Sequence, residues 1–377
     1  MELRDDAYRR WGERRHQSWL VRHLHLDIPL TIALIALASV GLAVLYSASN
    51  QDLTVVMRQL IRILLAFGTM LVIAQISPTH LRRWSPWLAG AGILLLVAVF
   101  LVGDIGKGAQ RWLDLGVFRF QPSEIMKLAL PMLIAWYLAE RALPPSLMHI
   151  AVSALLIAVP VALIAEQPDL GTSVLVACAG VFVIFLAGIS WRLIILLALI
   201  FAACLPLVWL NMHDYQRSRV LTFLNPESDP LNTGYHIIQS KIAIGSGGIY
   251  GKGYLNGTQS HLEFLPERST DFIFAVFAEE LGLIGALLLF ALYLFIVVRG
   301  LVIATQAQDT YTRLLAGSLT LTFFVYVFVN MGMVSGILPV VGLPLPLISY
   351  GGTSMVTIMA AFGVLMSIHT HRKMIQQ

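Results

Sequence analysis

Charged residues and cysteines are scarce in this sequence. Asp, Glu, Lys and Arg make up only 12% of the 377 residues, and hydrophobic residues make up 58%, whereas a soluble domain carries about 25% charged residues. These proportions, together with a mean hydropathy of +0.78, exclude an ordinary soluble domain and indicate an integral membrane protein with many spans. The net charge of +4 is modest, so no binding to nucleic acid is expected.

Motifs of several other protein classes are missing as well. The two cysteines, Cys178 and Cys204, lie in apolar runs and are predicted to be small buried side chains, not disulfide or zinc partners. No cluster of His and Cys for a zinc site is present. The glycine-rich run at 245–248 lacks the Lys and Ser or Thr of a nucleotide-binding loop, so chain flexibility is its favoured interpretation. No internal repeat of the common transporter kind is evident.

What the chain does contain is a series of long apolar segments. A membrane-spanning helix needs roughly 20 mostly apolar residues, and Pro168 divides one long stretch in two, because proline breaks a helix. The predicted fold class is an all-α polytopic membrane protein with ten transmembrane helices. The spans are expected near residues 28–48, 59–76, 86–103, 124–140, 149–165, 170–188, 191–210, 272–298, 312–338 and 346–369.

Basic residues set the expected orientation. Lys and Arg favour the cytoplasmic side, and a cytoplasmic N-terminus and C-terminus put most of them there. Residues 1–27 form a basic cytoplasmic segment that is too long to resemble a cleaved signal peptide, so the first span is expected to remain as an anchor. Residues 28–369 form the ten-helix domain, and 370–377 form a cytoplasmic tail. The loop at 211–271, between the seventh and eighth spans, is long and lies outside, so it is expected to be functional.

Two outer loops depart from this charge pattern. The loops at 104–123 and 211–271 hold most of the remaining basic residues, which is unusual for the outer side. At the start of the fourth span, Ser123 is the expected N-cap, and Glu124 and Lys127 lie three residues apart on one helical face. Two interpretations stay open for this pair: a structural ion pair near lipid, or one wall of a polar cavity.

Charged residues also crowd the start of the eighth span, in the sequence EFLPERSTDF at 263–272. Asp271 or Ser269 could serve simply as a helix cap, or Asp271 could be functional. Glu279 and Glu280 lie roughly two turns into the same span. A carboxylate at that depth is costly, so both are expected to be paired or functional.

The segment at 332–352 contains three prolines and no charged residue. Non-helical backbone at membrane depth persists only where protein covers it or water reaches it. This segment is therefore expected to be either a re-entrant connection lining the same cavity or a proline-ordered outer loop.

Several of these stretches together resemble one family. KGAQRWLDLG, FQPSEIMK, QPDLGTS, the SKIAIGSGG…GKG loop, FLPERSTDFIFAVFAEELG and PVVGLPLPLISYGGTS are similar to signature segments of the SEDS family (shape, elongation, division and sporulation). The similarity extends from about residue 28 to the C-terminal HTHRK, and it is greatest to the elongation members of Gram-negative bacteria.

This resemblance implies a peptidoglycan glycosyltransferase of the bacterial inner membrane. It would polymerise lipid II, an undecaprenyl-pyrophosphoryl disaccharide-pentapeptide, into glycan strands on the periplasmic face during cell elongation and rod-shape maintenance. The implied partners are lipid II, the growing strand, a class B penicillin-binding protein that crosslinks it, and other membrane proteins of the elongation complex. The essential acid of the family corresponds to Asp271, and its Glu–Lys pair corresponds to Glu124 and Lys127.

The chemistry of this reaction fits the residues. A carboxylate has to accept the proton of the attacking hydroxyl, and Asp271 is the expected general base of an inverting displacement of undecaprenyl diphosphate, with Glu267 as reserve acid. Cations have to hold the departing diphosphate. A divalent ion, Mg²⁺ or Mn²⁺, could assist through oxygen ligands. The candidate diphosphate partners are Lys107, Arg111, Arg217, Arg219, Lys241 and Arg268.

Two alternative functions stay open. A flippase that moves lipid II between leaflets could use the intramembrane groups Glu124, Lys127, Glu279 and Glu280. However, the short cytoplasmic loops offer few polar handles on that side. The second alternative is a non-catalytic scaffold that activates the penicillin-binding protein. The gathering of acidic and basic residues on the outer side favours the polymerase.

Overall fold

A computed structural model describes residues 24–106, 109–114, 119–212, 214–228, 233–261 and 267–371. Each of the ten predicted spans coincides with a helix in it. The helices are α3 (Ile28–Ala48), α4 (Leu53–Ala74), α5 (Pro78–Val102), α6 (Pro122–Ala139), α7 (Leu147–Glu166), α8 (Leu170–Leu186), α9 (Trp191–Asn211), α13 (Ile273–Thr305), α14 (Thr310–Val334) and α15 (Thr353–Thr370).

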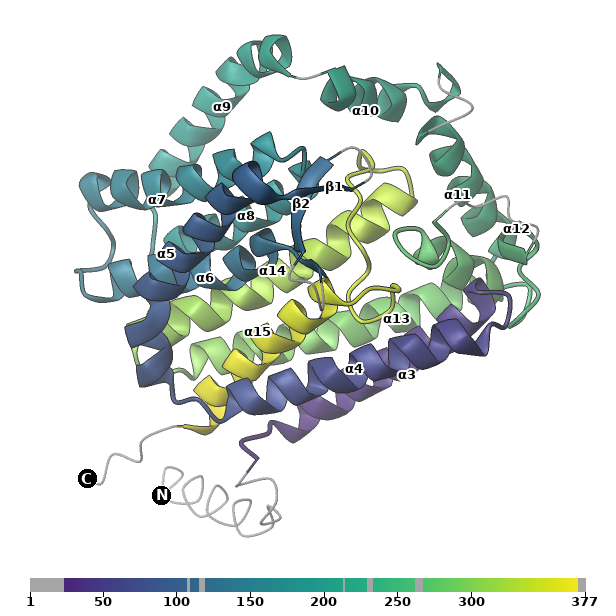
Figure 1. The fold of residues 1–377 in the computed structure, drawn as a ribbon, viewed down its shortest axis with the longest axis horizontal. Helices are drawn as coiled ribbons and strands as arrows, with labels where there is room; N and C mark the ends of the chain where they lie inside the picture. The colour runs from purple at the N-terminus through teal and green to yellow at the C-terminus, as the bar shows by residue number, and fades with distance from the viewer. Residues whose placement is uncertain are drawn as a thin grey trace.

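The helices form one bundle, from which α9 arches away in the upper part of Figure 1. Within the described residues, seven helices are long and apolar enough to cross a membrane, namely α3, α4, α5, α7, α13, α14 and α15, and α8 is a shorter apolar helix. The outer faces carry large apolar side chains such as Leu101, which is 80% exposed. Exposed apolar side chains suit a surface that lipid covers. The fold is that of a helical membrane protein, and the count of ten crossings stays a prediction.

Acidic side chains mark where several helices begin. Each accepts a hydrogen bond from a backbone N–H of the first turn, which satisfies a donor that the helix itself leaves unpaired. The start of α6 differs from the prediction, because Gln121 occupies the N-cap position and Ser123 lies buried inside the helix. The acidic caps are Asp27 for α3, Asp52 for α4, Asp169 for α8 and Asp309 for α14.

The long loop at 211–271 is largely helical where it is described. It contains α10 (Asp214–Leu224), a 3-10 turn η1 (Pro226–Ser228), α11 (Thr233–Gly247) and α12 (Thr258–His261). Of these helices, α11 packs along α13. Figure 1 shows α10, α11 and α12 in sequence along one side of the bundle.

A small antiparallel sheet adds to the predicted all-α fold. Strands β1 (Asp104–Gly106), β2 (Ala109–Asp114) and β3 (Arg119–Phe120) pair in the order β1–β2–β3 between α5 and α6. Helix periodicity does not register these strands, because they are only two to six residues long. The sheet matters because it carries Arg111 on β2.

The start of α3 and the end of α15 lie on the same side of the bundle. Asp27, directly before α3, pairs with Arg299 near the end of α13, with 2.6 Å between Oδ2 and Nη2. His369 on α15 lies 3.2 Å from the same carboxylate. The rings of His25 and His371 stack with centroids 4.0 Å apart. An even number of passes between these points is consistent with the predicted placement of both termini on one side.

The segment between α14 and α15 enters the bundle without helical structure. Backbone atoms of Leu347 and Ile348 lie directly against Gly41 of α3. Gly41 lies seven residues before the end of α3 at Ala48, so the segment reaches about 10 Å below that end at 1.5 Å per residue. The segment therefore lies inside the bundle and does not form an outer loop, whereas its predicted place in the wall of the polar cavity stays a prediction. This position of the segment also explains why α15 begins at Thr353 and not, as predicted, near residue 346.

Replacing Gly41 with alanine is expected to lower the melting temperature and to disturb this segment. A Cβ at residue 41 would lie 2.9 Å from Ile348 Cα and closer still to the carbonyl oxygen of Leu347, so backbone has to move. Gly68→Ala on α4 is the matched control, because nothing lies within 4 Å of a Cβ there. Alanine favours a helix over glycine by about 1 kcal/mol, so Gly68→Ala should melt at or above the wild-type temperature. Equal melting of the two variants would contradict the close packing at residue 41.

Candidate functional site

A buried ion pair forms at the start of α6. The ammonium of Lys127 donates to Glu124 Oε1 at 2.7 Å and to the Tyr326 hydroxyl on α14 at 2.6 Å. Glu124 and Lys127 are each 5% exposed, and Glu124 Oε2 makes no hydrogen bond to any described residue. The hydroxyls of Tyr326 and Ser354 lie 3.1 Å apart. The predicted pair is therefore present, and it joins α6, α14 and the start of α15.

Lys127 also borders a small cavity between α6, α14 and α15. Its volume is about 40 Å³, enough for water. The rest of its wall is mainly apolar, with Leu319, Phe323 and Phe362 among the lining residues. The structural ion pair is therefore what the structure shows. Of the pair, Lys127 alone borders the cavity, whose wall is mainly apolar and not polar as predicted.

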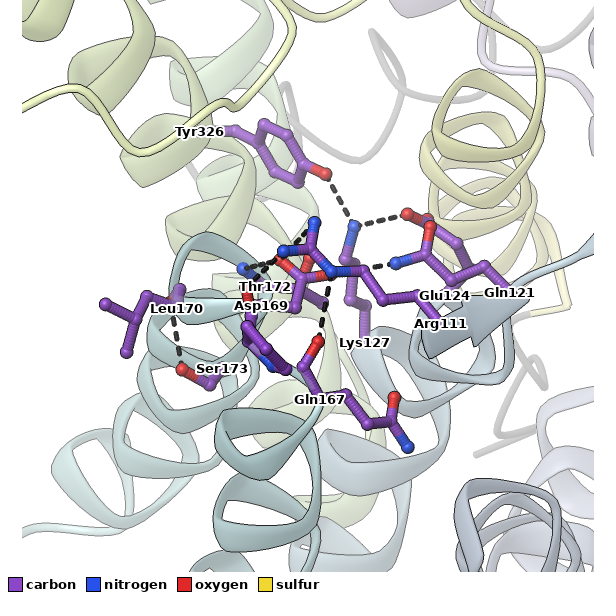
Figure 2. A network of polar contacts seen from close by, with 11 residues as sticks. Arg111, Gln121, Glu124, Lys127, Gln167, Asp169, Leu170, Thr172, Ser173 and Tyr326 are labelled. Carbon is purple, nitrogen blue, oxygen red and sulfur yellow. Dashed lines mark hydrogen bonds and ion pairs between the residues drawn. The ribbon is translucent and has the colours of Figure 1, made fainter. Parts of the chain in front are cut away.

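A second polar cluster lies at the turn between α7 and α8, beside the start of α6 (Figure 2). Gln121 Nε2 donates to Asp169 Oδ2 at 2.8 Å. Arg111 of β2 donates through Nε to the carbonyl of Gln167 at 3.1 Å and through Nη2 to the carbonyl of Pro168. Its Nη1 lies 4.0 Å from Asp169 Oδ1, and its side chain is 30% exposed. Arg111 therefore ties the small sheet to this turn.

Asp271 lies at the start of α13 and its backbone is held by α14. Asn330 Nδ2 donates to the carbonyl of Asp271 at 3.0 Å and to that of Leu343 at 2.6 Å. Phe272 occupies the N-cap position, so Asp271 precedes the cap. The Asp271 carboxylate faces Gly342, where a Cβ would lie 3.5 Å from Oδ2. The helix-cap alternative for Asp271 is thus not what the start of α13 shows.

The re-entrant segment holds the residues just before Asp271. Ser349 Oγ donates to the carbonyl of Thr270 at 2.6 Å, and Tyr350 N donates to that of Ser269 at 2.8 Å. Gln59 of α4 supports the segment from below, with Nε2 3.2 Å from the carbonyl of Ser349. These contacts connect the approach to Asp271 with α4 through buried backbone.

Arg62 of α4 brings a cation to the same segment. Its guanidinium carbon lies 4.4 Å from the centroid of the Tyr350 ring, a cation–π contact. Gly352 is also adjacent, since a Cβ there would lie 3.6 Å from Arg62 Cδ. Arg62 is partly exposed. The Arg62 guanidinium therefore contacts Tyr350, the residue whose backbone N–H binds the carbonyl of Ser269, two residues before Asp271.

The face of α14 connects the ion pair to Asp271. Tyr326 binds Lys127, and Asn330, four residues later on the same helix, binds the backbone of Asp271. Residues at i and i+4 lie about 5–6 Å apart on one helical face. Lys127 and Asp271, which are distant in sequence, therefore approach neighbouring turns of one helix. Helix α14 thus links the ion pair to the backbone of Asp271.

The other predicted acids and cations fall into different places. Glu267 is exposed, and its Oε2 accepts the hydroxyl of Thr270 at 2.8 Å. Arg268 lies in the same turn. Lys241 of α11 lies beside Gly336, at the start of the re-entrant segment, where a Cβ would be 2.7 Å from its Nζ. Glu267 and Arg268 therefore lie in the turn before Asp271, and Lys241 lies against the first residues of the segment between α14 and α15.

Arg217 lies elsewhere, although it was predicted in the same group. Its guanidinium donates to the last carbonyls of α9, those of Trp209 at 3.0 Å and Leu210 at 2.7 Å. Arg219 is partly exposed on α10, and Lys107 lies outside the described residues. A role in holding a diphosphate stays a prediction for all of these cations. Arg111 and Arg217, however, already have protein partners.

Glu279 and Glu280 are buried and paired, as expected. Glu279 is 0% exposed and lies 2.7 Å from Lys252 Nζ. Glu280 is 1% exposed and accepts the hydroxyl of Ser47 on α3. Both sit at a break in α13, where residues 247–253 pack against the helix. Within the glycine-rich run at 245–248, Gly247 packs against the backbone of Ala278, whereas nothing lies within 4 Å of a Cβ on Gly245 or Gly248. Flexibility of that run stays a prediction.

Sequence inspection missed four residues of the site. Gln59, Arg62 and Asn330 are polar residues inside predicted apolar spans, and the tendency of such groups to face the bundle interior could have found them. Tyr326 has no such signal, because tyrosine is common in apolar helices.

No group of three or more His, Cys, Asp and Glu side chains suited to a metal ion occurs within the described ranges. A metal site built from protein ligands alone is therefore not evident there. The predicted divalent ion would have to take some of its ligands from a bound diphosphate.

Together the fold and the site define a polytopic helical membrane protein with a buried polar site beside a re-entrant segment. A family model described as cell cycle protein, which covers FtsW, RodA and SpoVE, matches residues 20–374, and the chain belongs to this family. The resemblance to the SEDS family is therefore confirmed.

Named relatives agree. The chain is 57% identical over 355 residues to the peptidoglycan glycosyltransferase MrdB of Escherichia coli (strain K12), covering 94% of this chain and 96% of that one. It is 34% identical over 425 residues to the peptidoglycan glycosyltransferase RodA of Treponema pallidum, covering 92% and 98%.

Two solved structures share the fold. One is the rod-shape-determining protein RodA of Thermus thermophilus, with a TM-score of 0.70, 30% identity, and coverage of 92% of this chain and 98% of that one. The other comes from a peptidoglycan synthase complex that coordinates polymerization and crosslinking, with a TM-score of 0.80, 33% identity, and coverage of 93% and 99%.

Proposed function

We propose that this chain polymerises lipid II into glycan strands and that Asp271 is the general base of the reaction. The class of enzyme follows from its relatives, which are peptidoglycan glycosyltransferases matched over more than nine-tenths of each chain. The chain is a peptidoglycan glycosyltransferase of the group that determines cell shape. The substrate and the residue roles are the further steps of this proposal.

The observation that supports Asp271 is how firmly the chain positions it. Its backbone is fixed by Asn330, and the two residues before it are fixed by Ser349 and Tyr350. Its carboxylate lies beside Gly342, where a Cβ would be 3.5 Å from Oδ2. A general base has to be held within hydrogen-bond reach of the proton that it abstracts, and this arrangement provides such a fixed point.

The proposed chemistry is a single inverting displacement. Asp271 accepts the proton of a sugar hydroxyl, and the resulting oxygen attacks the anomeric carbon as its bond to the undecaprenyl diphosphate breaks. The diphosphate is a weak base, so the leaving group needs cations but no general acid. Arg268 lies three residues before Asp271, and Lys241 and Arg62 lie against the segment between α14 and α15. These three are the first candidates to stabilise the departing charge.

The proposed setting is the bacterial inner membrane. Ten crossings with both termini in the cytoplasm place Asp271 on the periplasmic side, where Lys and Arg would otherwise be rare. The partner is a class B penicillin-binding protein that crosslinks the new strand. Support for such a partner comes from the solved relative in a complex that coordinates polymerization and crosslinking.

The test combines three components in vesicles: the purified protein, its partner with crosslinking inhibited, and lipid II. The measurement is the amount of glycan strand formed. We expect strands to form, and chelation of Mg²⁺ and Mn²⁺ to slow their formation if Asp271 and Glu267 share a divalent ion with the diphosphate. Transfer of lipid II between leaflets without strands would support the flippase alternative. Activation of the partner without either activity would support the scaffold.

A further inference from the structure

Helix α13 is broken at Gly282, about three turns after Asp271. Gly282 has φ 64° and ψ −163° inside this helix, a conformation that is essentially restricted to glycine. The break separates a short N-terminal half at 273–281 from the longer half at 283–305. Residues 273–280 are all buried, so the short half is enclosed by protein.

Residues 248–253, which precede the break by about thirty positions, fill the gap. Their backbone takes up the N–H and C=O groups that the broken helix cannot pair internally, two on each side of Gly282. The four hydrogen bonds are Lys252 N to Glu279 O at 3.1 Å, Gly253 N to Glu280 O at 3.0 Å, Leu283 N to Gly248 O at 3.0 Å, and Ile284 N to Ile249 O at 3.2 Å.

The two backbones approach so closely that glycine is required at the contact. A Cβ on Gly251 would overlap the carbonyl of Glu280, and one on Gly282 would lie 2.6 Å from the carbonyl of Ile249. The Tyr254 hydroxyl donates to the carbonyl of Ala43 on α3 at 2.8 Å. Burial raises the pKa of Tyr254, so its hydroxyl keeps the proton that it donates. The inserted segment is thus anchored on both α13 and α3.

One carboxylate locks this insertion to the short half of α13. Glu279 Oε1 accepts from Lys252 Nζ at 2.7 Å, from Thr258 Oγ1 at 3.1 Å and from Gln259 N at 3.0 Å. Lys252 Nζ also donates to Thr258 Oγ1 at 2.7 Å. All of the donors come from residues 252–259, so this loop is tied to the short half through Glu279.

The position of Asp271 depends on the angle at this break, because Asp271 lies directly before the short half. A rotation about Gly282 would move residues 269–271 away from Ser349, Tyr350 and Asn330, the groups that hold them. Glycine alone does not resist such a rotation, since it is conformationally permissive. Something other than the helix backbone has to fix the angle at the break.

We infer that Lys252 and Glu279 are positioning residues for the glycosyltransferase reaction: their ion pair fixes the short half of α13 and thereby the place of Asp271. This inference rests on the proposed role of Asp271. A buried ion pair contributes little to stability compared with apolar packing, but it imposes one geometry. Here that geometry lies at the only break in α13.

The test compares two ion pairs on the same helix. Lys252→Met removes the pair at the break, where Lys252 is 27% and Glu279 0% exposed. Arg299→Met removes the pair at the other end of α13, where Arg299 is 27% and Asp27 1% exposed. The two should destabilise the protein comparably. Misplacing a catalytic group by 1 Å can cost about 100-fold in rate, so we expect Lys252→Met to lower kcat on lipid II at least tenfold with little change in KM.

Arg299→Met should keep kcat within about twofold of wild type, when rates are normalised to folded protein. Lys252→Arg should recover most of the loss, because it restores the charge. Glu279→Gln removes the charge but keeps the shape of the side chain, and it replaces Lys252→Met in the comparison if Lys252→Met does not fold. Equal kcat values for Lys252→Met and Arg299→Met would overturn the inference.

A second readout does not depend on activity. In a background with Cys178→Ser and Cys204→Ser, Thr270→Cys and Ser349→Cys place two thiols across the contact that holds the approach to Asp271. We expect Lys252→Met to slow their crosslinking several-fold and Arg299→Met to leave it unchanged; an unchanged rate in Lys252→Met would also overturn the inference. If Asp271→Asn proved fully active, the base assignment would fail, while this crosslinking would still report whether Lys252 fixes the short half.

Discussion

Replacing Asp271 with asparagine is expected to lower the rate of glycan polymerisation by about 10²–10⁴-fold, the contribution typical of a general base. Asparagine has nearly the same shape but cannot accept the proton of the attacking hydroxyl. The backbone contact from Asn330 goes to the carbonyl oxygen of residue 271, so it should survive the change. The measurement is the initial rate of strand formation from lipid II, with folding followed by thermal unfolding in detergent.

Glu267→Gln is the matched control for this experiment. Glu267 is an exposed carboxylate four residues earlier in the same turn, where it accepts the hydroxyl of Thr270. We expect this variant to retain most of the activity. If instead Glu267→Gln were inactive and Asp271→Asn active, the reserve acid would be the base, and full activity of both would remove the carboxylate mechanism altogether.

Replacing Lys127 with methionine is expected to destabilise the protein by about 3–5 kcal/mol, the usual cost of leaving one member of a buried ion pair alone. Glu124 would lose the ammonium bound to Oε1, and its Oε2 already lacks a partner among the described residues. The Tyr326 hydroxyl would lose its contact as well. The measurement is the melting temperature in detergent.

The double variant Glu124→Gln and Lys127→Met separates the charge from the packing. A neutral glutamine costs far less to bury than an unpaired carboxylate, so the double variant should regain most of the lost melting temperature. If the single and double variants melted together, the pair would matter through packing alone. An unchanged melting temperature in Lys127→Met would show that the ion pair makes no net contribution.

Local features were well predicted from the sequence. A spanning helix pairs its own backbone groups internally, so a long apolar run is enough to indicate where it lies. This is why each predicted span coincides with a helix. The Glu124–Lys127 pair was equally accessible, because a spacing of three residues places both side chains on one helical face. The expectation that Glu279 and Glu280 are paired or functional followed from their depth in an apolar run.

Contacts between distant segments could not be predicted in this way. Arg111 was expected to meet a diphosphate, yet in the fold it binds the turn between α7 and α8, more than fifty residues away. The small sheet escaped notice because its strands are short and irregular. The close contacts of Gly247 and Gly251 with α13 were likewise not predicted. In each case the contacting residues come from a distant part of the chain, and no local sequence pattern predicts them.

The amino-acid order alone thus decided which stretches enter a membrane and which acids have to be paired, because hydropathy and helical spacing act over a few neighbouring residues. Only the folded chain decided that Asn330, Ser349 and Lys252 would hold the residues around Asp271. That outcome depends on which helices pack side by side, and packing is settled by the whole bundle at once.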